Sequence, residues 1–173
     1  RNLGVLRTRP ELRVVFELRS RSRCIVNQDT LIANVSADAA LRGRVRFVSL
    51  ASMPIVEQLA LVGTSVAVAG AHGAAMAMTA FLPSSSGART SVLEIFPRRM
   101  TRQRTHAWFD YKRWAVMNSV AYYMLDRQKD TDGPDGCEDK DFRLCGNMTV
   151  DVGAVTARLR HMLATAYSNG TRV

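Results

Sequence analysis

Short apolar runs recur along this chain and are separated by segments with helical spacing. Runs of four to eight β-branched or aromatic residues, bounded by turn residues, predict buried strands. Five such runs occur: Arg13–Leu18, Arg44–Leu50, Ser65–Ala69, Val92–Phe96 and a shorter one at Val120–Met124. A strand that is buried on both faces is typical of a sheet covered by helices on each side.

The segments between these runs predict helices. Asn27 or Asp29 is suited to cap the first of them, and Pro54 fits the first position of the second, with Glu57 in its first turn. The expected helices cover Thr30–Val35, Pro54–Val62, Ala74–Phe81, an aromatic segment from Trp108 to Trp114, and Ala154–Tyr167. Strands that alternate with helices predict a doubly wound parallel α/β sheet, with a ligand site beyond the carboxyl ends of its strands.

The stretch from Ser65 to Pro97 is the centre of this pattern. It contains a glycine-rich turn, Gly70–Gly73, that holds His72 between a strand and an apolar helix. Such strand–turn–helix units hold phosphates in α/β proteins, because backbone N–H groups face the ligand there. Glycine in a tight turn also serves packing alone, and neither GxGxxG nor GxxxxGK[ST] is present. His72 is a base, a ligand contact or a structural residue on this pattern. His72 and Glu94 are both expected near the edge of the sheet where the strands have their carboxyl ends.

Length and hydropathy indicate one folded unit. A chain of 173 residues, 47% of them hydrophobic, is one domain or one lobe of a larger protein. It begins at Arg1 without Met or a signal peptide, and we interpret it as a fragment whose membrane anchor and N-terminal lobe are absent. The uncharged run Leu59–Leu82 is long enough to span a bilayer, but Gly70 and Gly73 interrupt it and favour a buried strand–helix unit.

The positive net charge of the chain indicates phosphate-bearing partners. The net charge is +9, and only three of the 24 basic residues are lysine. Arginine suits bidentate phosphate contacts, so Arg19, Arg21 and Arg23 either form an anion clamp on one side of an extended segment or are solvated. The aromatic residues that lie beside arginines over 98–114 either stack on nucleobases or pack on the core. A basic nucleic-acid-binding module is therefore a second hypothesis, against which the acidic segment 126–146 counts.

Cysteines and sequons indicate a secretory compartment. Cys24 lies in an apolar run and is expected to be a buried thiol, whereas Cys137 and Cys145 flank a polar loop that a disulfide could close. Asn-x-Ser/Thr triplets, which are candidate N-glycosylation sites, occur at Asn34, Asn147 and Asn169.

Several catalytic and metal-binding classes have no support in the sequence. It contains no Ser-His-Asp order, no CxxC pair and no HExxH. The segment 126–146 superficially resembles a calcium loop, but Pro134 and Asp135 occupy the fifth and sixth positions, and glycine is required at the sixth. We therefore interpret 126–146 as a solvated acidic loop.

A specific set of motifs resembles glycosyltransferase family 61, which includes plant xylosyl- and arabinosyltransferases, the EGF-domain O-GlcNAc transferase and the protein O-mannose N-acetylglucosaminyltransferase. The motifs run along nearly the whole chain. They are Arg19-x3-Arg23-x-Ile25-Val26-Asn27, Glu57-Gln58, His72-Gly73-Ala74, Phe81-Leu82-Pro83, Val92–Pro97, Trp114…Tyr122 and Asn147–Val152.

The resemblance implies the C-terminal, donor-binding lobe of a GT-B enzyme, a single Rossmann-like unit over 1–173. It implies inverting transfer of GlcNAc, xylose or arabinose from a UDP-sugar to a glycan or protein hydroxyl. It also implies a Golgi or endoplasmic reticulum location and a type II membrane anchor in the full-length protein. No obligatory metal is expected, although manganese is left open. A homologue that binds sugar nucleotide without catalysis is the alternative within the family.

The resemblance also implies site residues. Arg19 and Arg23 are expected to neutralise the diphosphate, and the turn and helix start to lie against it. His72 is expected to contact the phosphate or donor sugar, and Glu94 the ribose or sugar hydroxyls. The predicted donor-binding set is Arg19, Arg23, Asn27, Gly70, His72, Gly73, Ala74 and Glu94. No general base is evident in the sequence.

Overall fold

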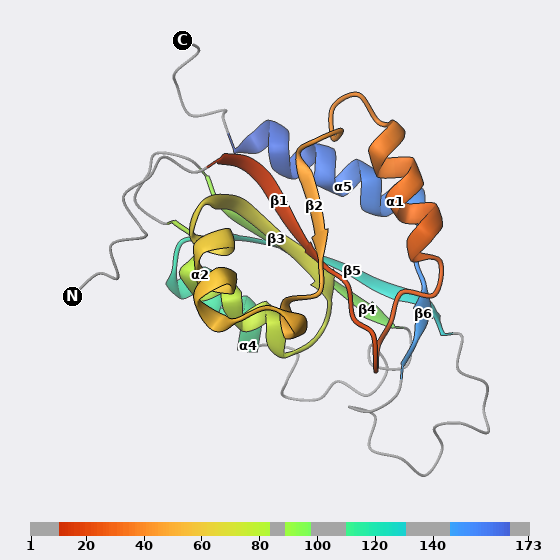
Figure 1. The fold of residues 1–173 in the computed structure, drawn as a ribbon, viewed down its shortest axis with the longest axis horizontal. Helices are drawn as coiled ribbons and strands as arrows, with labels where there is room; N and C mark the ends of the chain where they lie inside the picture. Colours follow the sequence, from red (N-terminus) through yellow and green to blue (C-terminus); the bar gives the residue numbers. More distant parts are fainter. Residues whose placement is uncertain (1–10, 84–88, 98–109, 131–145, 167–173) are drawn as a thin grey trace.

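A computed structural model describes residues 11–83, 89–97, 110–130 and 146–166, which form an α/β fold around one sheet (Figure 1). Several sequence predictions lie outside the described residues. These are the Cys137–Cys145 disulfide, the sequon at Asn169, the residues Trp108 and Phe109, the basic stretch 98–104 and most of the acidic segment 126–146.

The sheet confirms the predicted parallel architecture. Its strand order is β2-β1-β3-β4-β5-β6, and the first five strands are parallel, with a short antiparallel β6 at one edge. The strands are β1 (Glu11–Glu17), β2 (Val45–Val48), β3 (Ser65–Ala71), β4 (Ser91–Pro97), β5 (Ala121–Asp130) and β6 (Met148–Thr149). The chain first winds from β1 to β2 and then returns past β1 to β3. The carboxyl ends of β1 and β3 therefore flank the point where the winding reverses, and in such folds this is where ligands bind.

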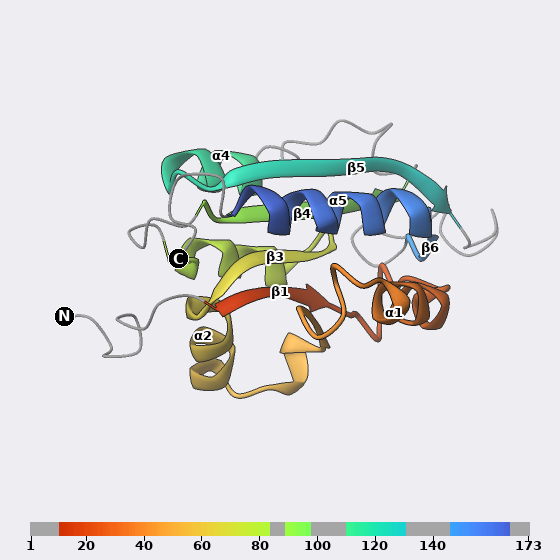
Figure 2. The same ribbon diagram turned by 90° about the horizontal axis from the view of Figure 1, so that it is seen from above.

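Helices cover both faces of the sheet (Figures 1 and 2). On one face, α1 (Gln28–Ala37) packs beside α5 (Val152–Thr165). On the other, α2 (Ile55–Gly63), the 3₁₀ helix η3 (Ala74–Phe81) and α4 (Asp110–Met117) pack on one another and on β3 and β5. A short 3₁₀ turn, η2 (Leu50–Ser52), links β2 to α2.

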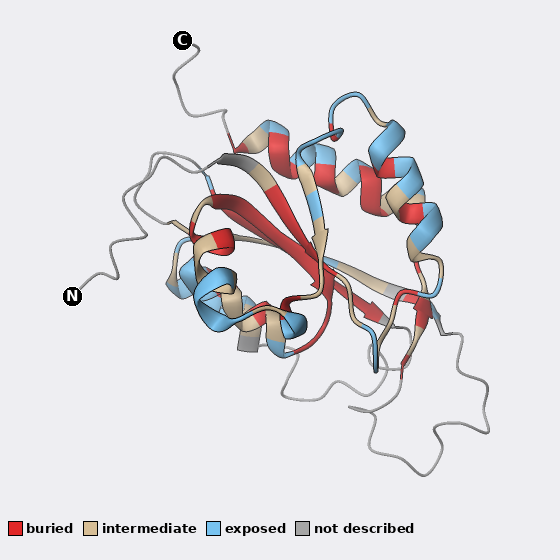
Figure 3. Ribbon diagram, viewed as in Figure 1, coloured by how far each residue is buried: buried red, intermediate tan, exposed pale blue. Residues whose placement is uncertain are grey.

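Alternation along the strands supplies both cores. In β1, Val14 and Phe16 belong to the core beneath α1 and α5, whereas Val15 contributes to a cluster with Leu50 and Leu61 on the opposite face. Figure 3 shows the buried colour concentrated on the central strands and on the inward sides of the helices. All seven residues of β3 are buried, as expected for a central parallel strand.

The run Leu59–Leu82 does not form a single membrane-spanning helix, in agreement with the prediction of a buried strand–helix unit. The run is divided among α2, β3 and η3. Within the described residues, no helix combines the length and apolar character that crossing a bilayer requires.

The helix Ala74–Phe81 has the predicted bounds but 3₁₀ geometry. Its buried residues Met76 and Thr79, followed by buried Leu82, repeat every three positions. A 3₁₀ helix has three residues per turn, so it places all three on the sheet side. Tertiary packing has overridden the α-helical preference of this alanine-rich segment.

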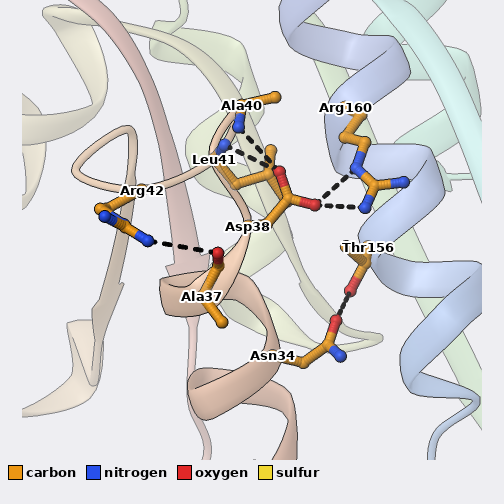
Figure 4. A network of polar contacts seen from close by, with 8 residues as sticks. All are labelled: Asn34, Ala37, Asp38, Ala40, Leu41, Arg42, Thr156 and Arg160. Carbon is orange, nitrogen blue, oxygen red and sulfur yellow. Dashed lines mark hydrogen bonds and ion pairs between the residues drawn. The ribbon is translucent and has the colours of Figure 1, made fainter.

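Polar contacts tie α1 to α5 near the surface (Figure 4). Arg160 of α5 donates from Nε to Asp38 Oδ2 (2.6 Å), and the other Asp38 oxygen accepts the backbone N–H groups of Ala40 and Leu41. Thr156 Oγ1 donates to Asn34 Oδ1 (2.9 Å). Asp38 thus ends α1 and anchors it to α5 at once.

Four local predictions were wrong. The Arg19–Arg23 segment is a turn and not an extended run, because Arg23 has φ 55°. Cys24 is half-buried, since only an isolated bridge at Ile25 attaches this run to the sheet. Residues 126–130 extend β5 along β4 and β6, so the strand predicted to end at Met124 continues into the segment assigned to the acidic loop. Gly70 belongs to β3, so the turn before η3 is shorter than Gly70–Gly73.

Candidate functional site

A pocket of about 670 Å³ opens at the carboxyl ends of β1 and β2, beside the point where the winding reverses. Its walls come from the turn after β1, from η2, from the first half of α2 and from η3. The lining residues are Glu17, Arg19, Ser20, Arg21, Ser49, Leu50, Ala51, Ser52, Gln58, Ala74, Ala75, Ala77, Met78 and Phe81.

Arg19 is fixed at this pocket by the turn that contains it. Its Nε donates to the carbonyl oxygen of Ser22 (2.7 Å), and its Nη2 lies 3.3 Å from Ser22 Oγ. The guanidinium lies directly against Gly73, where an added Cβ would come within 2.1 Å of Nη1. A side chain at position 73 would therefore displace the Arg19 guanidinium. The structure brings together Arg19, Gly73 and Ala74, three members of the predicted set.

Gly70 serves a close approach between strands. It pairs in register with Glu17 of β1 and with Glu94 of β4. A Cβ on Gly70 would lie 3.0 Å from both Cβ and the backbone oxygen of Glu17, so a larger residue would push β1 and β3 apart. Gly70 thus shapes the sheet beneath the site and does not line the pocket.

His72 and Glu94, both expected near this edge of the sheet, are in direct contact in a buried network with Tyr122. His72 Nδ1 lies 2.5 Å from Glu94 Oε1, and the Tyr122 hydroxyl donates to Glu94 Oε2 (2.6 Å). Glu94 is completely buried and His72 is 5% exposed. Because a carboxylate only accepts hydrogen bonds, this geometry requires the imidazole to carry a proton on Nδ1.

Aromatic contacts hold the imidazole from two sides. The Phe96 ring stacks on His72 with centroids 4.9 Å apart, and Tyr111 of α4 tilts against it at 5.6 Å. Burial, reinforced by the neighbouring Glu94 carboxylate, raises the pKa of the Tyr122 hydroxyl, so that this group stays a donor. Of the two interpretations of the aromatic segment, packing holds for Tyr111, while Trp114 is 42% exposed.

Glu17 is a pocket residue that the sequence interpretation missed. It ends β1, is 3% exposed, and its Oε2 accepts the backbone N–H of Leu50 (2.7 Å). Burial raises the pKa of this carboxyl, and the Leu50 hydrogen bond and the Arg19 charge only partly offset that rise. The one available signal was a carboxylate at the end of an apolar strand run, Arg13–Leu18.

Only Arg19 and Ala74 of the predicted donor-binding set line the pocket, and Asn27 and Arg23 are among the members outside the lining, together with Gly70, His72, Gly73 and Glu94. The Asn27 amide is paired with the backbone of Val150: its Nδ2 donates to the carbonyl oxygen and its Oδ1 accepts the N–H, both at 3.0 Å. Asn27 therefore joins the start of α1 to the segment before α5. Arg23 adopts left-handed backbone geometry in the turn that positions Arg19.

Two of the candidate N-glycosylation sites lie among the described residues. Asn34 is exposed on α1 and accepts the hydrogen bond from Thr156, and Asn147 Oδ1 accepts the Cys24 N–H (2.8 Å). Among the described residues, no group of three or more His, Cys, Asp or Glu side chains is arranged to hold a metal ion.

One family model matches this chain, and it is described as Glycosyltransferase 61; the match covers residues 4–89. It includes β1, the Arg19–Asn27 turn, the whole pocket lining and the His72-Gly73-Ala74 motif. Residues 4–89 therefore match glycosyltransferase family 61. This match confirms the resemblance that the motifs gave and supports a glycosyltransferase. A search of curated proteins gave no significant match.

The family 61 match ends before β4, so Glu94 and Tyr122 lie outside it. Their connection to the matched region is structural, through His72. The Arg19 turn, the pocket and the buried network are thus combined by the fold across the end of the match.

Proposed function

We propose that this family 61 lobe binds the donor of an inverting GT-B glycosyltransferase, with a UDP-sugar as donor and a glycan or protein hydroxyl as acceptor. One observation carries the proposal. The pocket at the winding reversal combines the Arg19 and Arg21 guanidiniums with the first residues of η3, and the matched family is one of glycosyltransferases.

Diphosphate recognition follows from this arrangement. A guanidinium that is held by Ser22 and seated on Gly73 is preorganised for a phosphate, and Arg21 supplies a second cation at the same pocket. In glycosyl transfer, negative charge grows on the leaving nucleoside diphosphate as the acceptor hydroxyl attacks the anomeric carbon. Fixed cations at that position lower the barrier, because they need no rearrangement as the charge develops. The Gly73–Ala74 turn completes the proposed phosphate-facing group, and Arg23 contributes by shaping the turn that positions Arg19.

His72 and Glu94 have different parts in this proposal. Glu94 holds the Nδ1 proton of His72, which leaves Nε2 of the imidazole for a phosphate or donor-sugar contact. Both oxygens of Glu94 already accept hydrogen bonds, so we assign Glu94 to positioning His72 rather than to a ribose hydroxyl. Asn27 acts in the same sense, by fixing the end of the Arg19 turn to Val150.

The cellular setting and the sugar follow only from the resemblance. We propose transfer of GlcNAc, xylose or arabinose in the Golgi or endoplasmic reticulum lumen, by a full-length type II membrane protein. Glycosylation at Asn34, Asn147 or Asn169 and a Cys137–Cys145 disulfide would accompany that location. No obligatory metal and no nucleic-acid partner belong to the proposal.

Calorimetric titration tests the donor assignment. UDP, UDP-GlcNAc, UDP-xylose and UDP-arabinose are titrated into the purified protein with and without Mn²⁺. We expect UDP binding that weakens by about tenfold or more in Arg19→Ala, from the loss of charge-assisted hydrogen bonds. Arg46→Ala is the matched control, because Arg46 is exposed on β2 and outside the pocket lining.

The competing functions give different results. Steeply salt-dependent RNA or DNA binding without UDP binding would favour the basic nucleic-acid module. UDP-sugar binding without transfer to any acceptor would favour the inactive homologue. A folded protein that binds none of the nucleotides would contradict the donor-binding proposal.

A further inference from the structure

The pocket that contains Arg19 also contains a buried carboxylate. Glu17 lines it from the end of β1 and is 3% exposed, whereas Arg21 is exposed. One oxygen of Glu17 accepts the Leu50 N–H, which fixes the side chain against η2. A carboxylate oxygen has room for a further acceptor contact, so this fixed group can receive hydrogen bonds from a bound molecule.

Charge decides which part of a nucleotide sugar Glu17 can face. A carboxylate repels phosphate, so the diphosphate belongs at the guanidiniums of Arg19 and Arg21. Glu17 must then face a neutral part that donates hydrogen bonds. Around it the lining supplies short polar side chains, namely Ser49, Ser52 and Gln58, with apolar surface from Met78 and Phe81.

Depth decides between the two hydroxyl-bearing parts of the donor. The transferred sugar has to be reached by the acceptor hydroxyl, so it belongs at the open side of the site. The ribose takes no part in the bond changes and can be enclosed. A carboxylate that is almost completely buried at a strand end therefore suits the ribose diol.

We infer that Glu17 is a nucleotide-binding residue that accepts hydrogen bonds from the ribose hydroxyls of the donor, while Arg19 and Arg21 hold its diphosphate. This inference rests on the proposed donor-binding function. The inference defines the orientation of the bound donor: the nucleoside lies between η2 and η3, and the phosphates lie at the turn after β1.

A binding cycle tests the ribose assignment. UDP, 2′,3′-dideoxy-UDP and pyrophosphate are titrated into wild type, Glu17→Gln and the control Asp29→Asn, which changes an exposed carboxylate on α1. For wild type we expect UDP to bind about tenfold or more tighter than its dideoxy analogue, because hydrogen bonds to a charged acceptor are strong. Glu17→Gln should weaken UDP by a similar factor and leave the dideoxy analogue and pyrophosphate unchanged.

Other results would overturn the assignment. If Glu17→Gln weakens UDP and its dideoxy analogue equally, Glu17 does not contact the diol. If it weakens pyrophosphate as well, Glu17 acts by orienting Arg19. If it affects only UDP-GlcNAc and leaves UDP unchanged, the carboxylate contacts the transferred sugar. Wild type and Arg19→Ala together separate the two proposals. If wild type binds neither UDP nor pyrophosphate, the donor-site proposal fails. If wild type binds both ligands and only Arg19→Ala weakens that binding, the donor site stands and the Glu17 role alone fails.

A stability measurement excludes a purely structural role. Gln retains an oxygen that can accept the Leu50 N–H, so Glu17→Gln keeps the link between β1 and η2. Because burial raises the pKa of Glu17, the wild-type carboxyl stabilises the fold most when it is protonated, and this contribution is lost as the pH rises through the raised pKa. The groups that act on the Glu17 carboxyl are the Leu50 N–H and the Arg19 charge, and Arg21 lines the same pocket. Glu17→Gln should therefore be at least as stable as wild type at pH 8 in denaturant unfolding. A variant that is less stable at every pH would show that Glu17 serves the fold.

Discussion

Polar residues on the α1/α5 face of the sheet join two helices near the surface, whereas those on the η3/α4 face lie on the strands beneath the helices. Asp38 and Arg160 form the first kind of contact, in which the Arg160 side chain is 55% exposed and the Asp38 side chain 7%. Glu94 and Glu17 form the second kind, at 0% and 3% exposure. Both faces share one sheet and each has an apolar core, the larger one beneath α1 and α5.

The difference indicates where function is located. An ion pair near the surface contributes little to the free energy of unfolding and has a small desolvation cost, so its presence needs no functional explanation. A buried carboxylate costs desolvation free energy unless it is paired, so its presence in a core needs a reason beyond packing. Both buried carboxylates lie in the same register row, with Gly70 between them. The raised pKa of the Glu17 carboxyl is of the kind that clusters at functional sites.

The largest stability effect is expected for Glu94→Ala. It leaves the His72 Nδ1–H and the Tyr122 hydroxyl without their acceptor in the core. We expect a loss of about 3 kcal/mol of unfolding free energy, measured by denaturant unfolding. Asn34→Ala, which removes the Thr156 contact on the other face, should cost less than about 1 kcal/mol. Equal losses for the two variants would remove the contrast between the faces.

A smaller and more specific effect is expected for Gly73→Ala. The new Cβ would occupy the space of the Arg19 guanidinium, so Arg19 must move away from the pocket. Binding of UDP should weaken about tenfold, with the strand core unaffected, because one charge-assisted contact is displaced.

Gly153→Ala on α5 is the control for Gly73→Ala. The nearest atom to its new Cβ is Asp151 Oδ1 at 3.4 Å, so the substitution fits. Stability should rise by up to about 1 kcal/mol through helix propensity, with UDP binding unchanged. Unchanged UDP affinity in Gly73→Ala would disprove the role of Arg19 at the pocket.

The smallest effect is expected for Asp38→Asn. The hydrogen bond from Arg160, together with backbone N–H donors, lowers the pKa of Asp38 below its ordinary value of 3.8. A lowered folded-state pKa gives stability above pH 3.8 that is lost as the pH falls through the folded-state value. Wild type should therefore be slightly more stable than Asp38→Asn at pH 7 and equal to it in strong acid. High salt should reduce the difference as well. If wild type is still more stable than Asp38→Asn in strong acid, the ion pair is not the source of the difference in stability.

The apolar pattern determined most of the fold. The bounds of the first four predicted strands agree closely with β1 to β4, and α1 begins directly after Asn27, a predicted cap, although the Asn27 side chain makes no capping hydrogen bond. Pro54 was expected at the first helical position and instead precedes α2, which begins at Ile55. Pro54 and Asp151 precede α2 and α5, where their backbone and side-chain preferences place them. The family motifs, likewise, were readable as residue strings, and the family 61 match agrees with them over residues 4–89.

What the sequence could not give is which side chains meet. The predicted donor-binding set contained Asn27, whose amide pairs with Val150, 123 positions away. It omitted Glu17, because nothing in a run such as Arg13–Leu18 shows that the carboxylate near its end will line a pocket. Local preferences set strands and helices within a few residues. Pocket walls depend on strand order and on contacts between segments distant along the chain. The sequence by itself therefore determined the parallel α/β architecture and the family, and only the tertiary structure decided that Arg19 lies on Gly73, that His72 shares Glu94 with Tyr122, and that Glu17 faces the pocket.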